Sequence, residues 1–336
     1  MDIREVFSVV DLHVAGDPVR VIVSGYPPIR GKTIRDKTAY LKTHLDHYRQ
    51  HLIFEPWGHA NMLGCLLVEP EREDSAYGLI FMDRDGYRVG DGHGIIGVAT
   101  FLVDTGRLTV DSEACDVPIR FDVDGGQVTA HLKVHESTAE RISVLNDRAF
   151  VVAEHPLVME DTETVTVSLA FGGALYAMVD SEQLNLSITA HNVDELRQWA
   201  MRIGNAFSAT GSPTHSWDVW RDRLKGVIFT DQPSDPTSFS KTLVVGTDGQ
   251  VIRSGASGAL SAAMAIWDYQ GLFPRNQPYA VEGLEGAIRY GRVLGVDETI
   301  GAYPSVRTTI EGQAYCVAFR RFFVNPEDTL GPFLIR

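Results

Sequence analysis

The stretch that most constrains the fold runs from Tyr87 to Gly106 and reads Y-R-V-G-D-G-H-G-I-I-G-V-A-T-F-L-V-D-T-G. It begins as a short strand, passes through a turn with closely spaced glycines, and continues as the apolar segment Ile95–Val103. Gly106 then suits a helix C-cap. The sequence therefore predicts a strand, a tight turn and a buried helix in direct succession.

The start of this helix is also a candidate anion site. The first turn of a helix leaves backbone N–H groups unpaired and carries a partial positive charge, so a carboxylate fits there. Gly92 and Gly94 let a ligand approach the backbone closely, and Asp91 and His93 are titratable groups at the rim. A plainer interpretation is also open, because Asp is a common helix N-cap and glycines serve ordinary turns.

A second junction of the same kind lies near residue 256. The β segments Thr242–Val245 and Gln250–Ile252 lead to a small-residue turn, Ser254–Gly258, and then to a buried helix from about Ala259 to Trp267. Two such junctions predict two pseudo-equivalent halves whose helix N-termini face one substrate. Small-residue turns also precede many ordinary helices, so the pairing alone does not establish a site.

The rest of the chain reads mainly as β segments. Val6–Val10 and Val19–Val23 are strand-like, Thr33–Gln50 is polar and helix-compatible, and Val193–Phe207 is an amphipathic helix. The segment that begins F-E-P-W-G-H-A-N-M crowds polar residues into a turn. A loop of this kind can line a cleft, which makes His59 a candidate for substrate contact.

The charge balance excludes some classes of partner. The 336-residue chain has 30 Lys and Arg against 44 Asp and Glu, for a formal net charge of −14. Nucleic acids and anionic membranes require a basic footprint, and the sequence has no Lys/Arg cluster. A small anionic substrate would therefore need a local positive site, such as a helix N-terminus.

The cysteines, Cys65, Cys115 and Cys316, are odd in number and lack metal-ligand spacing, so we expect neither a disulfide framework nor a metal site. The histidines lie in separate segments without a recognised ligand spacing. The first residues lack the apolar core of a signal peptide, and no apolar run approaches the roughly 18 residues of a membrane span. These features predict a soluble cytoplasmic protein.

Several segments, in the right order, resemble the proline racemases together with the hydroxyproline epimerases and trans-3-hydroxyproline dehydratases. They are D-L-H-V-A-G-D-P-V-R (similar to D-T-H-T-G-G-E-P-T-R), E-P-W-G-H-A-N-M (E-P-R-G-H-x-x-M), G-D-G-H-G-I-I-G (M-C-G-H-G-T-I-G), F-G-G-A-L-Y-A (F-G-G-x-F-Y-A) and the tail P-E-D-T-L (P-E-D-P-L). The resemblance spans nearly the whole chain.

The resemblance implies an α/β fold of the diaminopimelate-epimerase type. Each of two pseudo-symmetric halves would be a curved, mostly antiparallel sheet around a central helix, with the active site in the cleft between the halves. We expect one half to comprise residues 1–130 plus 305–336 and the other residues 131–304. The resemblance also implies a homodimer.

The departures from the family pattern are informative. By resemblance, the racemases use two cysteines, one at each helix N-terminus, as base and acid on opposite faces of the α-carbon. Asp91 stands at the first cysteine position, and the ungapped alignment of the second motif puts Ala256 at the other. A shift of one residue would offer Ser257 instead. Ile252 replaces the Asp that contacts the substrate's amine, which makes proline itself a doubtful substrate.

These positions define the predicted site. We expect Asp91 as base, His93 as orienter or acid and Ser257 as hydroxyl partner. The ordinary pKa of an aspartate is about 3.9, so Asp91 would need desolvation to act as a base on carbon. The expected substrate-binding residues are Gly92, Gly94, Ser254, Ala256, Gly258, Ile252 and His59.

Paired-thiol racemisation is excluded by these residues, whereas β-elimination needs only one base. We therefore predict a cofactor-independent lyase (dehydratase) or isomerase that acts next to the carboxylate of a small cyclic or hydroxylated acid. Two alternatives remain open: a catalytically inactive carboxylate-binding paralogue, and an epimerase of a hydroxyproline-like substrate.

Overall fold

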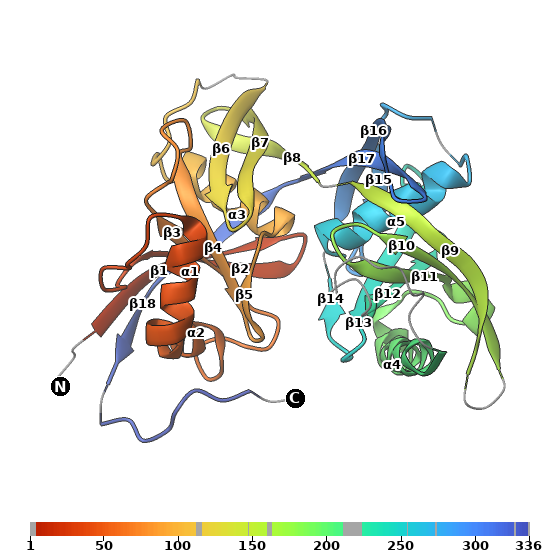
Figure 1. Ribbon diagram of the computed structural model, residues 1–336, viewed down its shortest axis with the longest axis horizontal. Coiled ribbons are helices and arrows are strands. Elements are labelled where there is room, and N and C mark those ends of the chain that lie inside the picture. The colour runs from red at the N-terminus through yellow and green to blue at the C-terminus, as the bar shows by residue number, and fades with distance from the viewer. Residues whose placement is uncertain are drawn as a thin grey trace. The chain divides into compact units, whose positions relative to one another are not determined.

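The computed structural model describes residues 5–111, 116–146, 148–159, 163–210, 224–253, 255–272, 274–325 and 327–334. The chain divides into two compact units, which are described separately (Figure 1). Unit 1 comprises residues 1–144 and 312–336, and unit 2 comprises residues 145–311. Within the described part of the chain, no helix is both long and apolar enough to cross a membrane.

Unit 1 is a curved sheet with one helix packed inside it. Its helices are α1 (Ile34–Tyr40), the π-helix η1 (Leu41–Leu45), α2 (Asp46–Ile53) and α3 (Gly92–Asp104). Its strands are β1 (Glu5–Val14), β2 (Asp17–Ser24), β3 (Leu63–Val68), β4 (Tyr77–Asp83), β5 (Gly86–Arg88), β6 (Val117–Val123), β7 (Gly126–His135), β8 (Thr138–Leu145) and β18 (Ala314–Val324). They pair in the order β18–β1–β2–β3–β4–β6–β7–β8, with β5 also on β4.

Unit 2 repeats this order. Its helices are the 3₁₀ turns η2 (Ser181–Leu184) and η3 (Ala190–Asn192), α4 (Val193–Thr210) and α5 (Ser257–Tyr269). Its strands are β9 (Ala149–Val158), β10 (Thr164–Phe171), β11 (Leu175–Asp180), β12 (Leu224–Asp231), β13 (Ser240–Gly246), β14 (Val251–Ile252), β15 (Tyr279–Glu282), β16 (Ile288–Ile300) and β17 (Tyr303–Gly312). They pair in the order β9–β10–β11–β12–β13–β15–β16–β17, and β17 returns to β9.

The repeat extends to strand direction. Among the described strand pairs, two in each unit are parallel: β2–β3 and β4–β6 in unit 1, and β11–β12 and β13–β15 in unit 2. The antiparallel pairs β3–β4 and β12–β13 lie between them. The prediction of two pseudo-equivalent halves is therefore confirmed, and α3 corresponds to α5.

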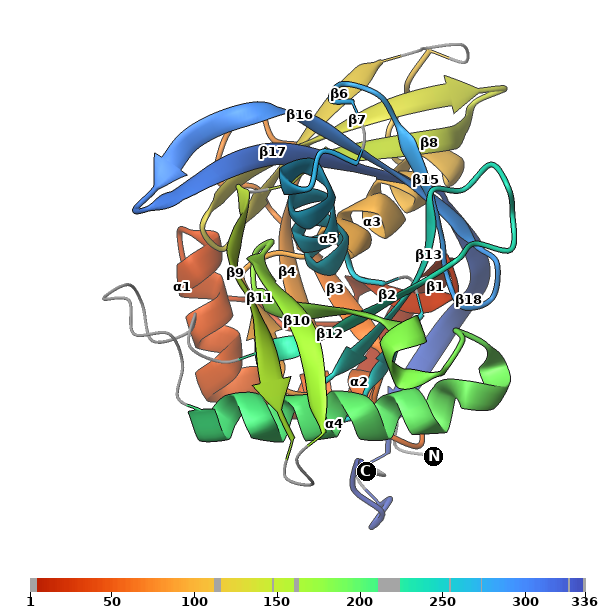
Figure 2. The same ribbon diagram turned by 90° about the vertical axis from the view of Figure 1, so that its right-hand side faces the viewer.

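The two central helices are buried because they are apolar on every side. All residues from His93 to Val103 in α3 and from Ala259 to Trp267 in α5 are buried. Figure 2 shows α5 surrounded by the strands of unit 2, with α4 outside them. The apolar stripe of α4, which includes Leu196 and Ile203, packs on the other face of the sheet. The predicted buried and amphipathic helices thus have the expected surroundings.

The unit boundaries lie elsewhere than the sequence analysis placed them. Residues 131–144 lie in unit 1 because β7 and β8 form a hairpin, paired from His135↔Thr138 to Ala130↔Val144. Residues 305–311 lie in unit 2 because β17 pairs with β16 and β9. Strand pairing, which the sequence pattern does not specify, sets both boundaries.

Each unit also contains a buried carboxylate at the same place in its sheet. Asp122 on β6 accepts hydrogen bonds from the backbone N–H groups of residues 71 and 72 (2.7 and 2.9 Å) and pairs with the Arg72 side chain. Glu282 on β15 accepts them from residues 234 and 235 (2.7 and 3.0 Å) and pairs with Lys241 at 3.2 Å. Each carboxylate holds the loop that leads into the neighbouring strand, β4 for Asp122 and β13 for Glu282.

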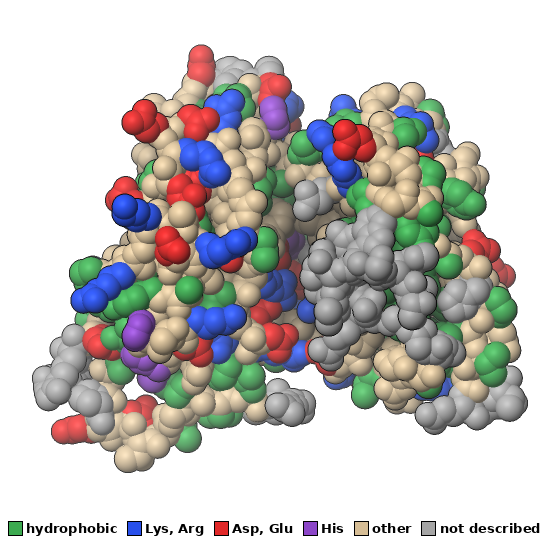
Figure 3. Space-filling view, in the orientation of Figure 1, with side chains coloured by type: hydrophobic (Ala, Val, Ile, Leu, Met, Phe, Trp, Pro, Cys, Tyr) green, Lys and Arg blue, Asp and Glu red, His purple; other side chains and the backbone are tan. Residues whose placement is uncertain are grey.

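The visible surface of unit 1 carries both signs of charge, with Lys and Arg interspersed among Asp and Glu (Figure 3). Such a mixed surface fits the absence of a Lys/Arg cluster from the sequence.

Candidate active site

Asp91 is the N-cap of α3. Its backbone is extended (φ −154°, ψ 109°), and its Oδ1 accepts a hydrogen bond from the Gly94 N–H at 2.9 Å. The plainer interpretation of Asp91 is therefore correct as far as it goes. A carboxylate has about four lone-pair positions, so this contact leaves Asp91 able to accept a proton elsewhere.

The second Asp91 oxygen faces an arginine. Arg88 Nη1 lies 3.1 Å from Asp91 Oδ2, and Arg88 Nε donates to Asp83 Oδ2. Asp83 Oδ1 in turn accepts from the backbone N–H groups of Asp85 (2.8 Å) and Gly86 (3.1 Å). Arg88 thus joins the end of the β4–β5 hairpin to the start of α3.

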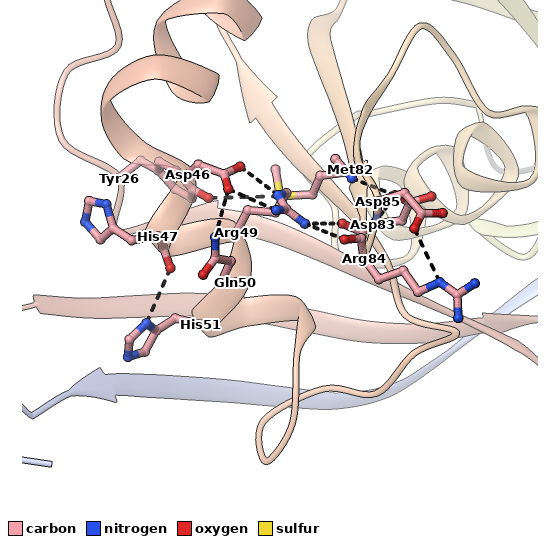
Figure 4. Close-up of polar contacts among 11 residues, drawn as sticks. Tyr26, Asp46, His47, Arg49, Gln50, His51, Met82, Asp83, Arg84 and Asp85 are labelled. Carbon is pink, nitrogen blue, oxygen red and sulfur yellow. Dashed lines mark hydrogen bonds and ion pairs between the residues drawn. The ribbon is translucent and has the colours of Figure 1, made fainter. Parts of the chain in front are cut away.

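The same hairpin turn is fastened from α2. Arg49, which is buried, donates from Nη1 to the carbonyl oxygens of Asp83 (2.5 Å) and Arg84 (3.1 Å). Its Nε and Nη2 bind both oxygens of Asp46 at 2.7 and 2.9 Å, and these hydrogen bonds lower the pKa of that carboxyl (Figure 4). Arg49 therefore fixes the turn that anchors Arg88.

The first turn of α3 is closely packed. His93 is buried, and a Cβ on Gly94 would lie 2.4 Å from the Phe81 ring, so this glycine is required by helix packing. Cys65 on β3 is fully buried near Asp91. Burial first and the Asp91 charge second raise the pKa of its thiol, which favours the neutral form.

The equivalent end of α5 has a different chemistry. Ala256 is its N-cap, at φ 44° and ψ 135°, and makes no side-chain capping bond. The Leu260 N–H donates to the Ala256 carbonyl at 3.0 Å, just as the Ile95 N–H donates to that of Asp91 at 2.9 Å. Ala256 therefore holds the position in unit 2 that Asp91 holds in unit 1, and Ser257 is the first helical residue.

Backbone packing explains two glycines at this end. A Cβ on Gly258 would lie 2.4 Å from the carbonyl oxygen of Gly172, and one on Gly172 would lie 2.2 Å from that of Gly258. The F-G-G turn thus packs directly on the first turn of α5. The buried Arg289 lies beside Gly255, where a Cβ would come within 2.6 Å of Nη2.

The other predicted residues have mixed outcomes. Ile252 is half-buried on β14 and packs against the core around α5. His59 is exposed, and its Nδ1 accepts from the Asn61 N–H at 3.2 Å. Ser254 lies outside the described residues. Among the residues that are described, no three or more His, Cys, Asp or Glu gather as a metal site.

The sequence analysis missed Arg88 and the buried pair of Asp11 with Arg20. Arg20 binds both Asp11 oxygens (2.7 and 2.9 Å) and the carbonyls of Leu52 (2.6 Å) and Trp57 (2.9 Å). It therefore joins the β1–β2 hairpin to the end of α2 and to the loop that contains Trp57. The sequence contained a sign of this pair, because Asp11 and Arg20 are the same number of residues from the turn of one hairpin and so face each other across it.

A family model described as proline racemase matches residues 9–333. The chain belongs to the proline racemase family. It is 32% identical over 331 residues to the trans-3-hydroxy-L-proline dehydratase of Bacillus thuringiensis subsp. konkukian, an alignment that covers 98% of both chains. It is 30% identical over 324 residues to the proline racemase of Acetoanaerobium sticklandii, with 96% of both chains covered.

The proline racemase family fold is also seen in a crystal structure of a hydroxyproline epimerase from Agrobacterium vitis with bound trans-4-hydroxy-L-proline. Its TM-score is 0.83 at 22% identity, and the match covers 99% of this chain and 96% of the epimerase. These findings confirm the predicted family and its α/β fold. The named relatives include both racemases and dehydratases.

Proposed function

We propose that this chain is an acid/base enzyme that acts at the α-carbon of a small cyclic, hydroxylated carboxylic acid, with dehydration as its reaction. The observation that carries the proposal is the difference between two equivalent helix starts. Asp91 provides a proton-accepting side chain at α3, and Ala256 provides none at α5. One base is sufficient for elimination, whereas epimerisation through opposite faces needs a group on each side.

The proposed reaction breaks a C–H bond and a C–O bond and forms a carbon–carbon double bond. Asp91 takes the α-proton, and backbone N–H groups at a helix start stabilise the enolate-like charge on the substrate carboxylate. The β-hydroxyl then leaves as water with a proton from Ser257 or His93. Elimination requires the hydroxyl on the carbon next to the α-carbon, so a 3-hydroxyproline suits it and a 4-hydroxyproline does not.

Two kinds of relative support this substrate class. The Bacillus relative is named for dehydration of trans-3-hydroxy-L-proline, and the Agrobacterium structure contains trans-4-hydroxy-L-proline. The missing group at Ala256 supports one competing function, a carboxylate-binding protein without turnover. It argues against a two-base epimerase.

The test is a substrate panel followed by NMR and combined with the Asp91→Asn variant. We expect the wild type to convert trans-3-hydroxy-L-proline to a dehydrated product and the variant to lose this activity while it keeps its circular dichroism spectrum. Full turnover by the variant would remove Asp91 from its role. Binding of the panel members without turnover by the wild type would establish the inactive carboxylate-binding alternative.

We also propose a cytoplasmic homodimer. The cytoplasmic location rests on Cys65 and Cys316, which are free thiols, and the dimer rests on the family resemblance. Light scattering of the purified protein tests the dimer, and a mass near 37.1 kDa would contradict it.

A further inference from the structure

Arg88 is an unusual neighbour for a catalytic base, because its positive charge offsets the negative charge of the carboxylate that must accept the proton. It lies three residues before Asp91 and reaches Asp91 and Asp83 at once, with Nη1 on the first carboxylate and Nε on the second. The exposed fraction of its side chain is 36%, against 16% for Asp91. The pair is therefore partly shielded from water. Two charges in such surroundings interact more strongly than they do on an open surface.

The substrate makes such a counter-ion necessary. A carboxylic acid substrate carries a negative charge at neutral pH, and its carboxylate is bonded to the carbon from which Asp91 takes the proton. Two like charges so close together oppose binding. Asp83 adds a third negative charge, but its Oδ1 is already occupied by two backbone N–H groups.

We propose that Arg88 is a positioning residue that allows a carboxylate to serve as the base for an anionic substrate. Its charge offsets that of Asp91, and its planar fork, fixed at Asp83, aims the Asp91 carboxylate. The inference rests on the proposed role of Asp91. The proposal explains why an arginine lies beside this base.

The surroundings of Arg88 fit a fixed orientation. Asp83 ends β4 and Arg88 ends β5, so the two stand on paired strands of one hairpin. The buried Arg49 fastens the carbonyls of Asp83 and Arg84 in the connecting turn. Asp91 is held in addition by the Gly94 N–H, so both of its oxygens have a defined partner.

A double-mutant cycle tests the charge role. Dissociation constants for trans-4-hydroxy-L-proline, which the proposed reaction cannot dehydrate, would be measured by NMR titration for wild type, R88A, D91N and R88A/D91N. We expect R88A to weaken binding at least tenfold when Asp91 is present and less than threefold when residue 91 is uncharged. An equal loss in both backgrounds, no loss in either, or no binding by any of the four proteins would overturn the proposal.

A kinetic comparison tests the positioning role. Arg88→Lys keeps the positive charge but cannot contact both carboxylates in the same plane. We expect its KM to stay within threefold of wild type and its kcat to fall at least tenfold. Equal changes in both constants, or none, would contradict a positioning role.

Arg197 provides the matched control. It forms an ion pair with Asp194 at the same spacing, three residues apart at 3.2 Å, on α4. We expect R197A to leave ligand binding and kcat unchanged, and a loss equal to that of R88A would overturn the proposal. If D91N keeps full turnover while the cycle still shows coupling, Asp91 is not the base, but Arg88 remains its counter-ion.

Discussion

The starts of α3 and α5 occupy equivalent places in two units with the same strand order, yet their side chains differ. At α3 the cap is Asp91, which is bonded to the Gly94 N–H and ion-paired with Arg88. At α5 the cap is Ala256, which has no side-chain bond. Both helices have a glycine in their first turn, Gly94 and Gly258, that packing requires.

This comparison separates what the fold needs from what the chemistry needs. The glycines and the buried helices are present in both units, so they belong to the scaffold. At the two cap positions, a side chain that can accept a proton is present at α3 but not at α5. Two units with the same strand order thus differ in the side chain at the helix start, which supports the single base that we propose.

The largest expected effect comes from removing the carboxylate of Asp91, which distinguishes the start of α3 from that of α5. Asp91→Asn should lower kcat by about a thousandfold, because general-base catalysis contributes about 10²–10⁴ in rate. The amide oxygen still caps the Gly94 N–H, so the melting temperature should change little. Asp194→Asn on the exposed face of α4 is the control and should retain kcat. A decrease in kcat of less than tenfold in D91N would contradict the proposed role of Asp91 as the single base.

Substitution of the shared glycines should damage both units alike. Gly94→Ala and Gly258→Ala each place a Cβ 2.4 Å from its neighbour, the Phe81 ring in one case and the Gly172 carbonyl in the other. Overpacking of this kind costs about 1–3 kcal/mol. Urea denaturation should show a loss in both variants. Gly90→Ala, which has open space around the added Cβ, should stay within about 0.5 kcal/mol.

The two buried carboxylates should respond to acid in the same way. Burial raises the pKa of Asp122 and Glu282, but hydrogen bonds from backbone N–H groups and a neighbouring cation outweigh it, so both pKa values are lowered. Their stabilisation is therefore present above the unfolded pKa values, near 4, and is lost as pH falls through the folded ones.

Asp122→Asn and Glu282→Gln should each lower the free energy of unfolding by about 1–2 kcal/mol at pH 7 and by less at pH 3. Denaturation at both pH values measures this. A loss that is as large at pH 3 as at pH 7 would show that the charge of the carboxylate is unimportant.

The smallest effect concerns Ala256, whose φ of 44° is unfavourable for a residue with a Cβ. Ala256→Gly should stabilise the protein by about 1 kcal/mol, because glycine relieves backbone strain of this order. Ala259→Gly, within α5, should have the opposite sign. A loss of stability in A256G would mean that the backbone at this cap is not strained.

Much of the fold could be predicted from sequence because buried helices are apolar on all sides. This pattern predicted the two buried helical segments, Ile95–Val103 and Ala259–Trp267. A turn of small residues precedes each of them. The pairing of the strands left no comparable pattern. The unit boundaries near residues 144 and 311 therefore depend on hairpin partners that only the structure provides.

The candidate site was predictable in part. Asp91 and His93 stood out by their position before an apolar helix. The choice between Ala256 and Ser257 depended on a one-residue shift, which only the observed helix start could resolve. Arg88 was missed because its second partner, Asp83, lies across a hairpin, and no periodic pattern relates the two.

The most direct test of a single base is the stereochemical outcome at the α-carbon. The wild type would be incubated with trans-3-hydroxy-L-proline in deuterated water, and all products would be followed by NMR. The account predicts a dehydrated product, deuterium at the α-carbon only in recovered substrate that keeps its original configuration, and no C2 epimer. Accumulation of the epimer would contradict it, since inversion requires a second proton-carrying group on the opposite face.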